Sequence, residues 1–495
     1  ARVSASTSGA GNGGKINVEA QGIELIGESK DSSPSGLFTT TDSIGNAGES
    51  LDIKTNTLVV RDGARVSAST SGAGNGGDIK VNAQDIQLLG FGERKDDSSS
   101  GLFIRAEEGS TGNAGESLDI TTNTLLVEDG ARVSASTSGA GNGGDINVEA
   151  QDIQLLGFGE SKDGYPSGLF IAAEEGSTGN AGEILDIKTN SLLVKDGAEV
   201  SASTSGAGAG GDINVEARNI VKVEDGARIS AEGLSSGRAG NLSINADSIR
   251  LNNKAQLNAS TQSNDDSKIQ ATINITSKDL IMRGESKIVT NAEGDNVNGG
   301  NININTDILA ALENSDISAN SLNFLGGNIR IEAQGIFGTQ FRLKETGESD
   351  ITATGADDID NSSGNVEIFT PNIDLNTGLI TLATIPVETE VAQSCTAGGS
   401  IAQSRFEIIG RGGLPILPND ALSADAVQVD LVSIKPENNK PAPTNVSTKK
   451  KTSTPKKIVE ATGWVRNKKG EIFFVADAAN GKQVNNWDKN NHCRG

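Results

Sequence analysis

The sequence predicts an all-β protein whose main part is a parallel β-helix, a solenoid of stacked coils that we call rungs. One apolar pattern recurs along the chain, its residues are typical of β-strands, and turn-forming pairs flank each copy. In the copy formed by Ile146, Val148 and Ile153, one residue separates the first two apolar side chains and four separate the last two. No copy departs from this pattern. Its twelve middle residues are Val18, Ile53, Val81, Ile120, Val148, Ile187, Val215, Ile244, Ile275, Ile304, Ile331 and Ile368.

The composition suits a narrow core. Aromatic residues make up 3% of the 495 residues and there are 62 glycines, so large side chains are too few to fill a wide globular core. A solenoid grows along an axis and needs only stacked aliphatic side chains. The formal net charge of −23 argues against nucleic acid as a partner. Because no apolar run reaches 18 residues, no transmembrane segment is expected.

Each copy is expected to form about three short strands separated by turns. The apolar-polar-apolar alternation is that of a strand, and Gly-Gly, Asp-Gly and Thr-Asn pairs mark the turns. A further strand, such as 131–136, precedes the pattern in many copies. Twelve rungs at the strand spacing would give a rod of roughly 55–60 Å. Asn56, Asn123 and Asn190 could stack as an amide ladder on every second rung.

A larger repeat of two rungs is present in the first half of the chain. Residues 1–14, 64–77 and 131–144 all read ARVSASTSGAGNGG, whereas the fourth copy, 198–211, differs at Glu199 and Ala209. The longer rung of each pair carries an insertion such as 157–166. Insertions in a solenoid map to loops on one face, so these loops should recur on alternate rungs.

Carboxylate pairs are the nearest candidates for catalysis. Parallel β-helices also host polysaccharide-cleaving enzymes, which need carboxylates around a sugar cleft. Glu107–Glu108 and Glu174–Glu175 occupy equivalent copies of the repeat, and enzymes do not usually duplicate a site rung by rung. We interpret both pairs as solvated loop residues and assign no catalytic residue.

Metal, cofactor and nucleotide chemistry find little support in the sequence. Gly141–Asp145 faintly resembles a calcium-binding glycine-aspartate repeat, but it returns after 67 residues instead of nine, which favours a tight turn with positive φ. His492 is the only histidine, and no cysteine cluster could complete a zinc site with it. No nucleotide-binding fingerprint is present, so no cofactor and no metal site are expected.

Serine and threonine are dense on the side of the strand that should face outward. Ser134, Ser136, Thr137 and Ser138 illustrate this pattern. Such a face could contact glycans or other surfaces, and it could equally be a plain solvated strand face.

The pattern and composition change near Pro386, and we expect four segments. Residues 1–386 form the repeat region, 387–435 a post-helix segment with the motif GRGGLP, 436–457 a disordered Pro/Lys/Thr linker, and 458–495 a small β module. The chain opens inside a repeat and no signal peptide precedes it, so we interpret the sequence as a C-terminal fragment.

The C-terminal motifs resemble a known family. Degenerate rungs followed by Cys395, FEIIGRGGLP, PNDAL, VDL and EATGW look like the C-terminal part of large cyanobacterial filamentous-haemagglutinin-type exoproteins, which resemble two-partner secretion passengers and are sometimes described as S-layer family proteins. The resemblance implies a right-handed β-helix exported through an outer-membrane two-partner-secretion transporter. It supplies no catalytic residues. In the oxidising exterior so implied, Cys395 and Cys493 could form a disulfide that fastens the tail to the rod, with two free thiols as the alternative.

Together these features favour a secreted, cell-surface rod that presents repeated loops for adhesion or matrix building, with surface glycans or matrix as possible partners. The alternatives are a β-helix enzyme that degrades polysaccharide and a purely structural surface-layer protein.

Overall fold

The computed structural model describes residues 1–27, 33–92, 99–159, 165–264, 271–357, 359 and 361–371, together with the backbone of 463–466 and 472–475. The chain divides into two compact units, Ala1–Asn376 and Thr377–Gly495. The described residues contain strands and no helix, so none of them forms an apolar helix that could cross a membrane.

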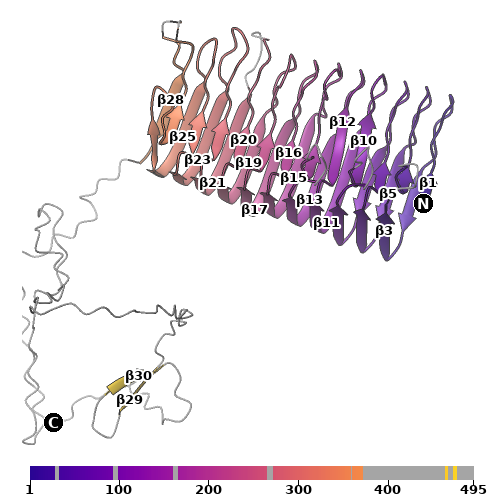
Figure 1. The fold of residues 1–495 in the computed structure, drawn as a ribbon, viewed down its shortest axis with the longest axis horizontal. Helices are drawn as coiled ribbons and strands as arrows, with labels where there is room; N and C mark the ends of the chain where they lie inside the picture. The colour runs from indigo at the N-terminus through magenta and orange to yellow at the C-terminus, as the bar shows by residue number, and fades with distance from the viewer. Residues whose placement is uncertain are drawn as a thin grey trace, which may run out of the picture. The chain divides into compact units, whose positions relative to one another are not determined.

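The first unit is a parallel β-helix, as the sequence predicts (Figure 1). Two sheets run along its axis, and we call them the short-strand sheet and the long-strand sheet. The short-strand sheet consists, in spatial order, of β1 (Arg2–Ser4), β4 (Gly36–Phe38), β7 (Arg65–Ser67), β10 (Gly101–Ala106), β12 (Arg132–Thr137), β14 (Gly168–Phe170), β16 (Glu199–Ser201), β18 (Arg228–Ser230), β20 (Gln256–Asn258), β22 (Lys287–Val289), β24 (Asp316–Ser318), β27 (Ser349–Thr352) and β26 (Thr339–Phe341). All of these strands pair in parallel.

The long-strand sheet carries the recurring apolar pattern. It consists of β2 (Ile16–Glu19), β5 (Ser50–Lys54), β8 (Asp78–Asn82), β11 (Ser117–Glu128), β13 (Asp145–Leu156), β15 (Ile184–Lys195), β17 (Asp212–Glu224), β19 (Leu242–Asn252), β21 (Thr272–Arg283), β23 (Asn301–Ala311), β25 (Asn328–Phe337) and β28 (Asn365–Phe369), with β3 (Gly22–Ile26), β6 (Thr57–Arg61) and β9 (Asp85–Leu89) paired beside them. The first three rungs keep the two predicted strands separate. From β11 to β25, these two merge into one long strand.

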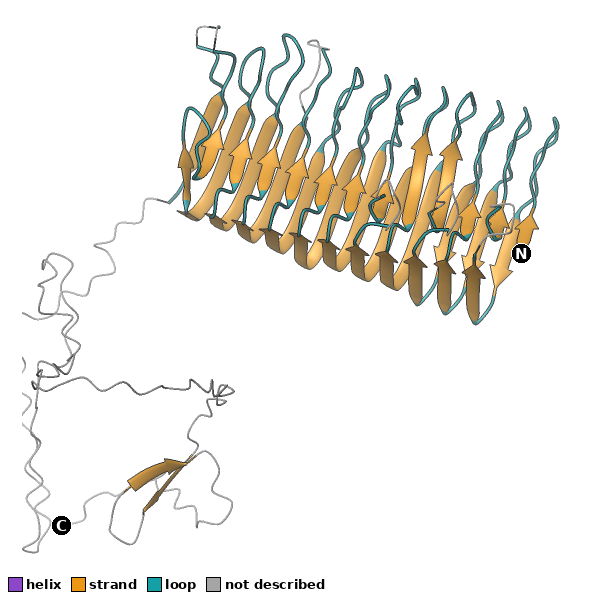
Figure 2. Cartoon of the chain, viewed as in Figure 1, coloured by secondary structure: helices purple, strands orange, loops and turns teal. Residues whose placement is uncertain are grey.

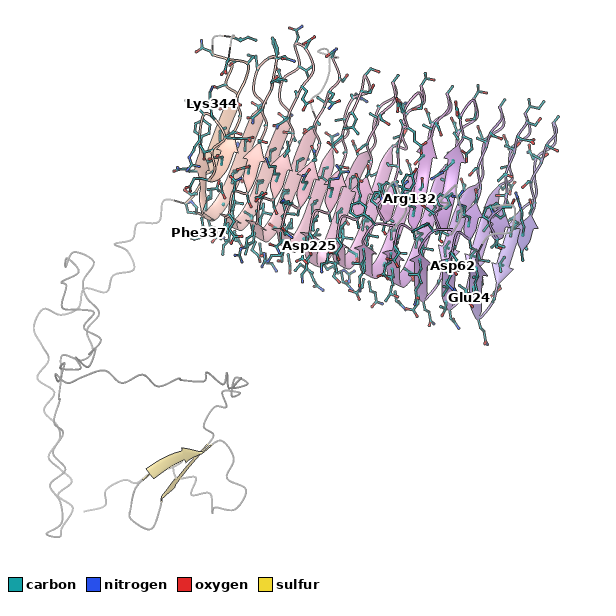
Figure 3. All side chains as sticks on the ribbon, viewed as in Figure 1. Glu24, Asp62, Arg132, Asp225, Phe337 and Lys344 are labelled. Atoms are coloured by element: carbon teal, nitrogen blue, oxygen red, sulfur yellow. The ribbon has the colours of Figure 1, made fainter. Side chains whose placement is uncertain are left out.

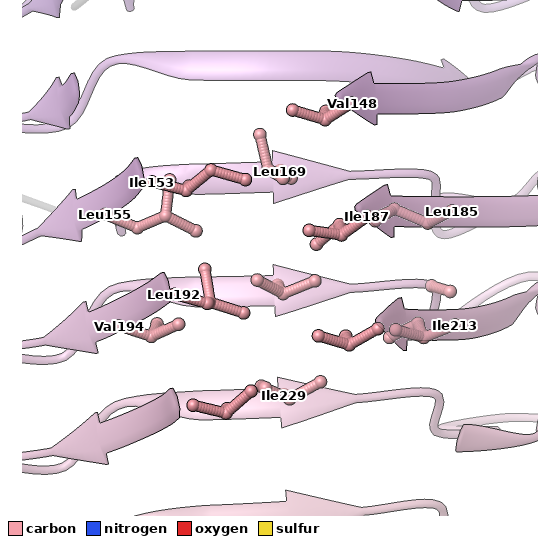
Figure 4. Close-up of a cluster of buried hydrophobic side chains, with 14 of the residues drawn as sticks. Val148, Ile153, Leu155, Leu169, Leu185, Ile187, Leu192, Val194, Ile213 and Ile229 are labelled. Atoms are coloured by element: carbon pink, nitrogen blue, oxygen red, sulfur yellow. The ribbon is translucent and has the colours of Figure 1, made fainter. Parts of the chain in front are cut away.

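The twelve middle residues of the pattern stand in one register along the axis. Val148 pairs with Ile187, which pairs with Val215, and the same correspondence holds from Val18 to Ile368. Ten of these side chains belong to the buried core between the sheets and Val18 packs against it, whereas Ile368 in the last rung is partly exposed; Figure 4 shows part of this aliphatic core. Burial of this continuous apolar core is the main stabilising contribution to the solenoid.

In the interior of the stack, one predicted core position is wrong. The pattern assigns Ile220 to the core, but the buried residue is Val221. In the pairing of β15 with β17, two residues, Arg218 and Asn219, stand opposite Asn190. This bulge adds one residue to the strand, and a shift of one residue exchanges its inward and outward faces.

The loops alternate as the two-rung repeat predicts. Up to β16, short Asp-Gly turns join the long-strand sheet to the short-strand sheet on every second rung, and both turn residues have positive φ, as at Asp129 (55°) and Gly130 (84°). The intervening rungs carry the longer connections, such as the one from β13 to β14. Figure 2 shows a third set of loops that project from the same edge of every rung.

At the C-terminal end of the solenoid, the last strand of the short-strand sheet does not follow the order of the chain. β27 stacks on β24, and β26, which precedes β27 in the chain, occupies the outer edge. Arg342 forms a salt bridge with the fully buried Asp350 and holds this edge in place. In the second unit, β29 (Gly463–Arg466) and β30 (Ile472–Val475) form an antiparallel pair, as expected of the small C-terminal β module. The expected boundary near Pro386 lies outside the described residues.

Candidate functional site

The carboxylate pairs singled out in the sequence do not form a site. Glu107, Glu108, Glu174 and Glu175 are exposed in turns that follow the short-strand sheet. The backbone N–H of Glu107 donates to the carbonyl of Thr70 at 2.8 Å. Glu174 makes the equivalent bond two rungs later. Among the described residues, no three His, Cys, Asp or Glu side chains converge in a way that could hold a metal ion.

The serine-rich strand face is not a solvated surface. Ser134 and Ser136 point away from the core, yet each is only 2% exposed, and their Oγ atoms lie 2.8 Å apart. Ser134 stands in register between Phe103 and Phe170 of the adjacent rungs. Both phenylalanines are buried, so their rings shield the hydroxyls from solvent. The interpretation of these serines as an exposed face is therefore wrong, and only Ser138 of the four predicted residues is partly exposed.

Arginine side chains fasten the longer connections onto the short-strand sheet. The guanidinium of Arg132 lies 4.2 Å from the ring centre of Phe170 and 5.1 Å from that of Tyr165, and its Nε donates to the carbonyl of Pro166 at 3.3 Å. Arg65 makes equivalent contacts with Phe103 and Ser99. We call these contacts the arginine clamps. Figure 3 shows Arg132 in the middle of the solenoid.

The Arg132 clamp is desolvated. Burial lowers the pKa of Arg132 to about 10, with Arg105 acting in the same direction and Glu199 and Glu174 opposing it. The sequence contains a pattern that indicates the arginine clamps, because the tripeptide RVS alternates with GLF from rung to rung. It was missed because the partners lie on neighbouring rungs.

The fourth copy of the repeat has lost its clamp. Glu199 replaces arginine there, and it forms a salt bridge of 3.2 Å with Arg228 of the next rung. The Oγ of Ser230 donates to Glu199 at 2.8 Å. Glu232 lies close by and accepts a hydrogen bond from Asn258. Burial raises the pKa of Glu232 to about 6, with Glu199 adding to the shift and Arg228 opposing it. Sequence reasoning did not identify this cluster.

Asparagine side chains form a ladder along the projecting loops. The Oδ1 of each ladder residue accepts the backbone N–H of its equivalent on the next rung, as from Asn113 to Asn142 at 2.9 Å. The ladder consists of Asn12, Asn46, Asn75, Asn113, Asn142 and Asn180. The ladder ends at Asn180, whose Oδ1 accepts the backbone N–H of Ala209. Ala209 replaces the asparagine found in the other three copies of the repeat, so it has no side-chain amide to continue the ladder.

Glycines beside this ladder are needed for close approach of the rungs. A Cβ added to Gly141 would lie 1.9 Å from the carbonyl oxygen of Gly112, and the same conflict recurs at Gly179. Gly141, Gly143 and Gly144 do not have positive φ, so the predicted reason for this glycine-rich turn is wrong.

A groove on the outer surface of the long-strand sheet crosses five rungs, from β11 to β19. Its volume is about 800 Å³. One wall carries Thr121, Glu149, Lys188, Glu216 and Asn245, the other carries Asn123, Gln151, Asn190, Arg218 and Asp247, and the residues between them are Thr122, Ala150, Thr189 and Ala217.

Side-chain amides occupy the second wall on successive rungs. The Nε2 of Gln151 donates to the Oδ1 of Asn123 at 3.0 Å. The predicted ladder on alternate rungs therefore needs correction, because a glutamine stands between the asparagines. The groove is therefore a polar recess that extends over five successive rungs.

The remaining sequence-predicted residues, Cys395, Cys493 and His492, lie outside the described residues, and so does the possible disulfide. In comparisons with known proteins, no family model, no curated protein and no solved structure matches the chain. The resemblance to filamentous-haemagglutinin-type exoproteins accordingly stays a prediction.

Proposed function

We propose that this chain is the rod of a secreted or cell-surface filamentous exoprotein that acts without catalysis in adhesion or matrix building. The observation that carries the proposal is the fixed register of twelve rungs, which repeats equivalent outward positions, most of them polar or charged, at constant spacing. An array of weak, equivalent sites binds an extended partner with high avidity although no single site is strong. The family resemblance supports export through an outer-membrane two-partner-secretion transporter.

The clamps and ladders support a mechanical role. They tie adjacent rungs together outside the apolar core, at the loops and at the short-strand sheet. A purely structural surface-layer protein would need the same rigidity, and it differs from an adhesin only in having no ligand.

The test is to incubate the full chain with cell-wall and matrix preparations and to measure retention and release of reducing sugars together. Retention without release supports the adhesive rod. Absence of retention on every surface favours the purely structural layer protein and overturns the adhesive one.

One observation favours the enzymatic alternative. Glu232, with its raised pKa, lies beside the arginine-paired Glu199, and glycosidases combine a protonated carboxyl with an ionised one. Release of sugar by the natural chain but not by Glu232→Gln would establish an enzyme and overturn the proposal of a non-catalytic rod.

A further inference from the structure

The groove on the long-strand sheet has the properties of a binding surface for one class of polymer. We infer that it binds an extended, uncharged polysaccharide that lies along the axis of the rod. This inference rests on the proposed adhesive function and adds to it a location and a ligand class.

The groove runs in the direction in which the protein repeats. Its walls are columns of side chains contributed one per rung by β11, β13, β15, β17 and β19, whose backbones stand at the strand spacing of about 4.8 Å. A ligand that lies along the groove therefore meets one polar or charged side chain from each wall at each step. An extended polymer of small identical units fits such a surface better than a compact ligand does.

The groups that face the ligand suit hydroxyls. After the bond between Gln151 and Asn123, the Nδ2 of Asn123 and the Oε1 of Gln151 have no partner among the described residues. The amide of Asn190 makes no hydrogen bond within the same part of the chain. Each amide thus offers a donor or an acceptor, and a sugar hydroxyl can serve as either. The residues between the walls, such as Ala150 and Ala217, turn their side chains into the core, so no side chain stands between the two walls.

The charges in the groove argue against a charged polymer. Along one wall Lys188 lies between Glu149 and Glu216, and on the other wall Arg218 is adjacent to Asp247 in the column. Positive and negative groups therefore alternate at the rung spacing, and no field of one sign extends over several rungs. A uniformly charged chain would meet repulsion at every second step.

The backbone of the sheet argues against a peptide. The strands beneath the groove are central in the long-strand sheet, and both edges of β13, β15 and β17 are already paired with neighbouring rungs. A peptide could not add as a further strand there. The groove also lacks the aromatic or aliphatic pockets that usually anchor a peptide side chain.

Native affinity electrophoresis of the full chain tests the inference. The net charge of −23 gives the protein mobility, and soluble linear β-glucan, mannan or polygalacturonate is cast in the gel. We expect a neutral polymer to retard the natural chain and polygalacturonate not to. The double variant Asn123→Ala/Asn190→Ala should bind about tenfold more weakly or worse, since each amide contributes hydrogen bonds.

The control variant is Asn303→Ala/Asn305→Ala, which removes two exposed amides from β23 of the same sheet outside the groove. It should be retarded like the natural chain. If both double variants bind equally well, the groove is not the site while the adhesive function stands. If no neutral polymer retards the chain but cell-wall material still retains it, the inference fails alone. If nothing retains it, both fail.

Discussion

At the residue scale, glycines in the projecting loops show that a residue can be required by the neighbouring rung and not by its own turn. Gly141 has no unusual backbone conformation, but the carbonyl of Gly112 occupies the place where its Cβ would be. The carbonyl belongs to a backbone that cannot move without breaking the stack. A methyl group at this position must therefore push two rungs apart.

We expect Gly141→Ala to destabilise the solenoid by several kcal/mol, as overpacking against backbone does. Gly11→Ala is the matched control, because Gly11 lies in an identical sequence and nothing lies within 4 Å of its added Cβ. Urea unfolding followed by circular dichroism would measure both variants. Equal midpoints would show that the close approach at Gly141 is not a constraint.

Glu232 makes stability depend on pH in a direction that can be worked out. Burial raises its pKa from 4.5 to about 6, so between these values the folded protein holds a proton that the unfolded chain releases. Stability should therefore fall by about 2 kcal/mol as the pH rises through this window. Glu232→Gln keeps the acceptor for Asn258 and removes the charge, so it should be more stable than the natural chain above pH 6.

Urea midpoints between pH 4.5 and 8 would measure this effect. Glu149→Gln, which removes an exposed carboxylate from the long-strand sheet, is the control and should keep the pH dependence of the natural chain. A Glu232→Gln variant whose stability falls across the window as steeply as that of the natural chain would show that Glu232 is not the responsible group.

At the element scale, the arginine clamps explain how long connections are tolerated on alternate rungs. A rung with a longer connection presents glycine and phenylalanine, as at Gly168 and Phe170, and the preceding rung supplies the arginine that covers the ring. Where the longer connections end, the arginine is replaced by Glu199, which pairs with Arg228 instead. The two differences in the fourth copy of the repeat, Glu199 and Ala209, thus mark the points at which a clamp and a ladder stop.

Arg132→Ala should free the connection between β13 and β14. The change removes two ring contacts and a hydrogen bond, and we expect a loss of about 2 kcal/mol. Amide hydrogen exchange of Gly168–Phe170 should become faster, while that of β17 stays unchanged. Arg238→Ala, at an exposed position, is the control and should alter neither. Unchanged exchange in Arg132→Ala would mean that the connection is held by its own contacts.

At the scale of the whole molecule, the sequence predicts the number of rungs and their register but not their outer surface. The inward residues follow the same apolar pattern in each rung, so the sequence of a single copy is enough to predict that Val148 and its equivalents face the core. Burial of Ser134, the raised pKa of Glu232 and the walls of the groove depend on side chains of adjacent rungs. These rungs are 27 to 39 residues away in the chain, and only the register of the stack brings them together. The bulge at Arg218 is invisible for the same reason, because it is defined by pairing with Asn190.

A stack in which each rung contacts only its neighbours should respond differently to the same change at its centre and at its end. Ile187 and Ile368 occupy the same column, but Ile187 is fully buried in the sixth of the twelve rungs and Ile368 is 39% exposed in the last. Ile187→Ala should cost about 2–5 kcal/mol and, by weakening two interfaces in the middle of the stack, separate urea unfolding into two transitions. Ile368→Ala should cost about 1 kcal/mol or less and leave one transition, because little apolar surface is lost there. If the two variants unfold alike, the rungs are coupled over a longer range than neighbour contacts allow, or the last rung is covered as completely as the central one.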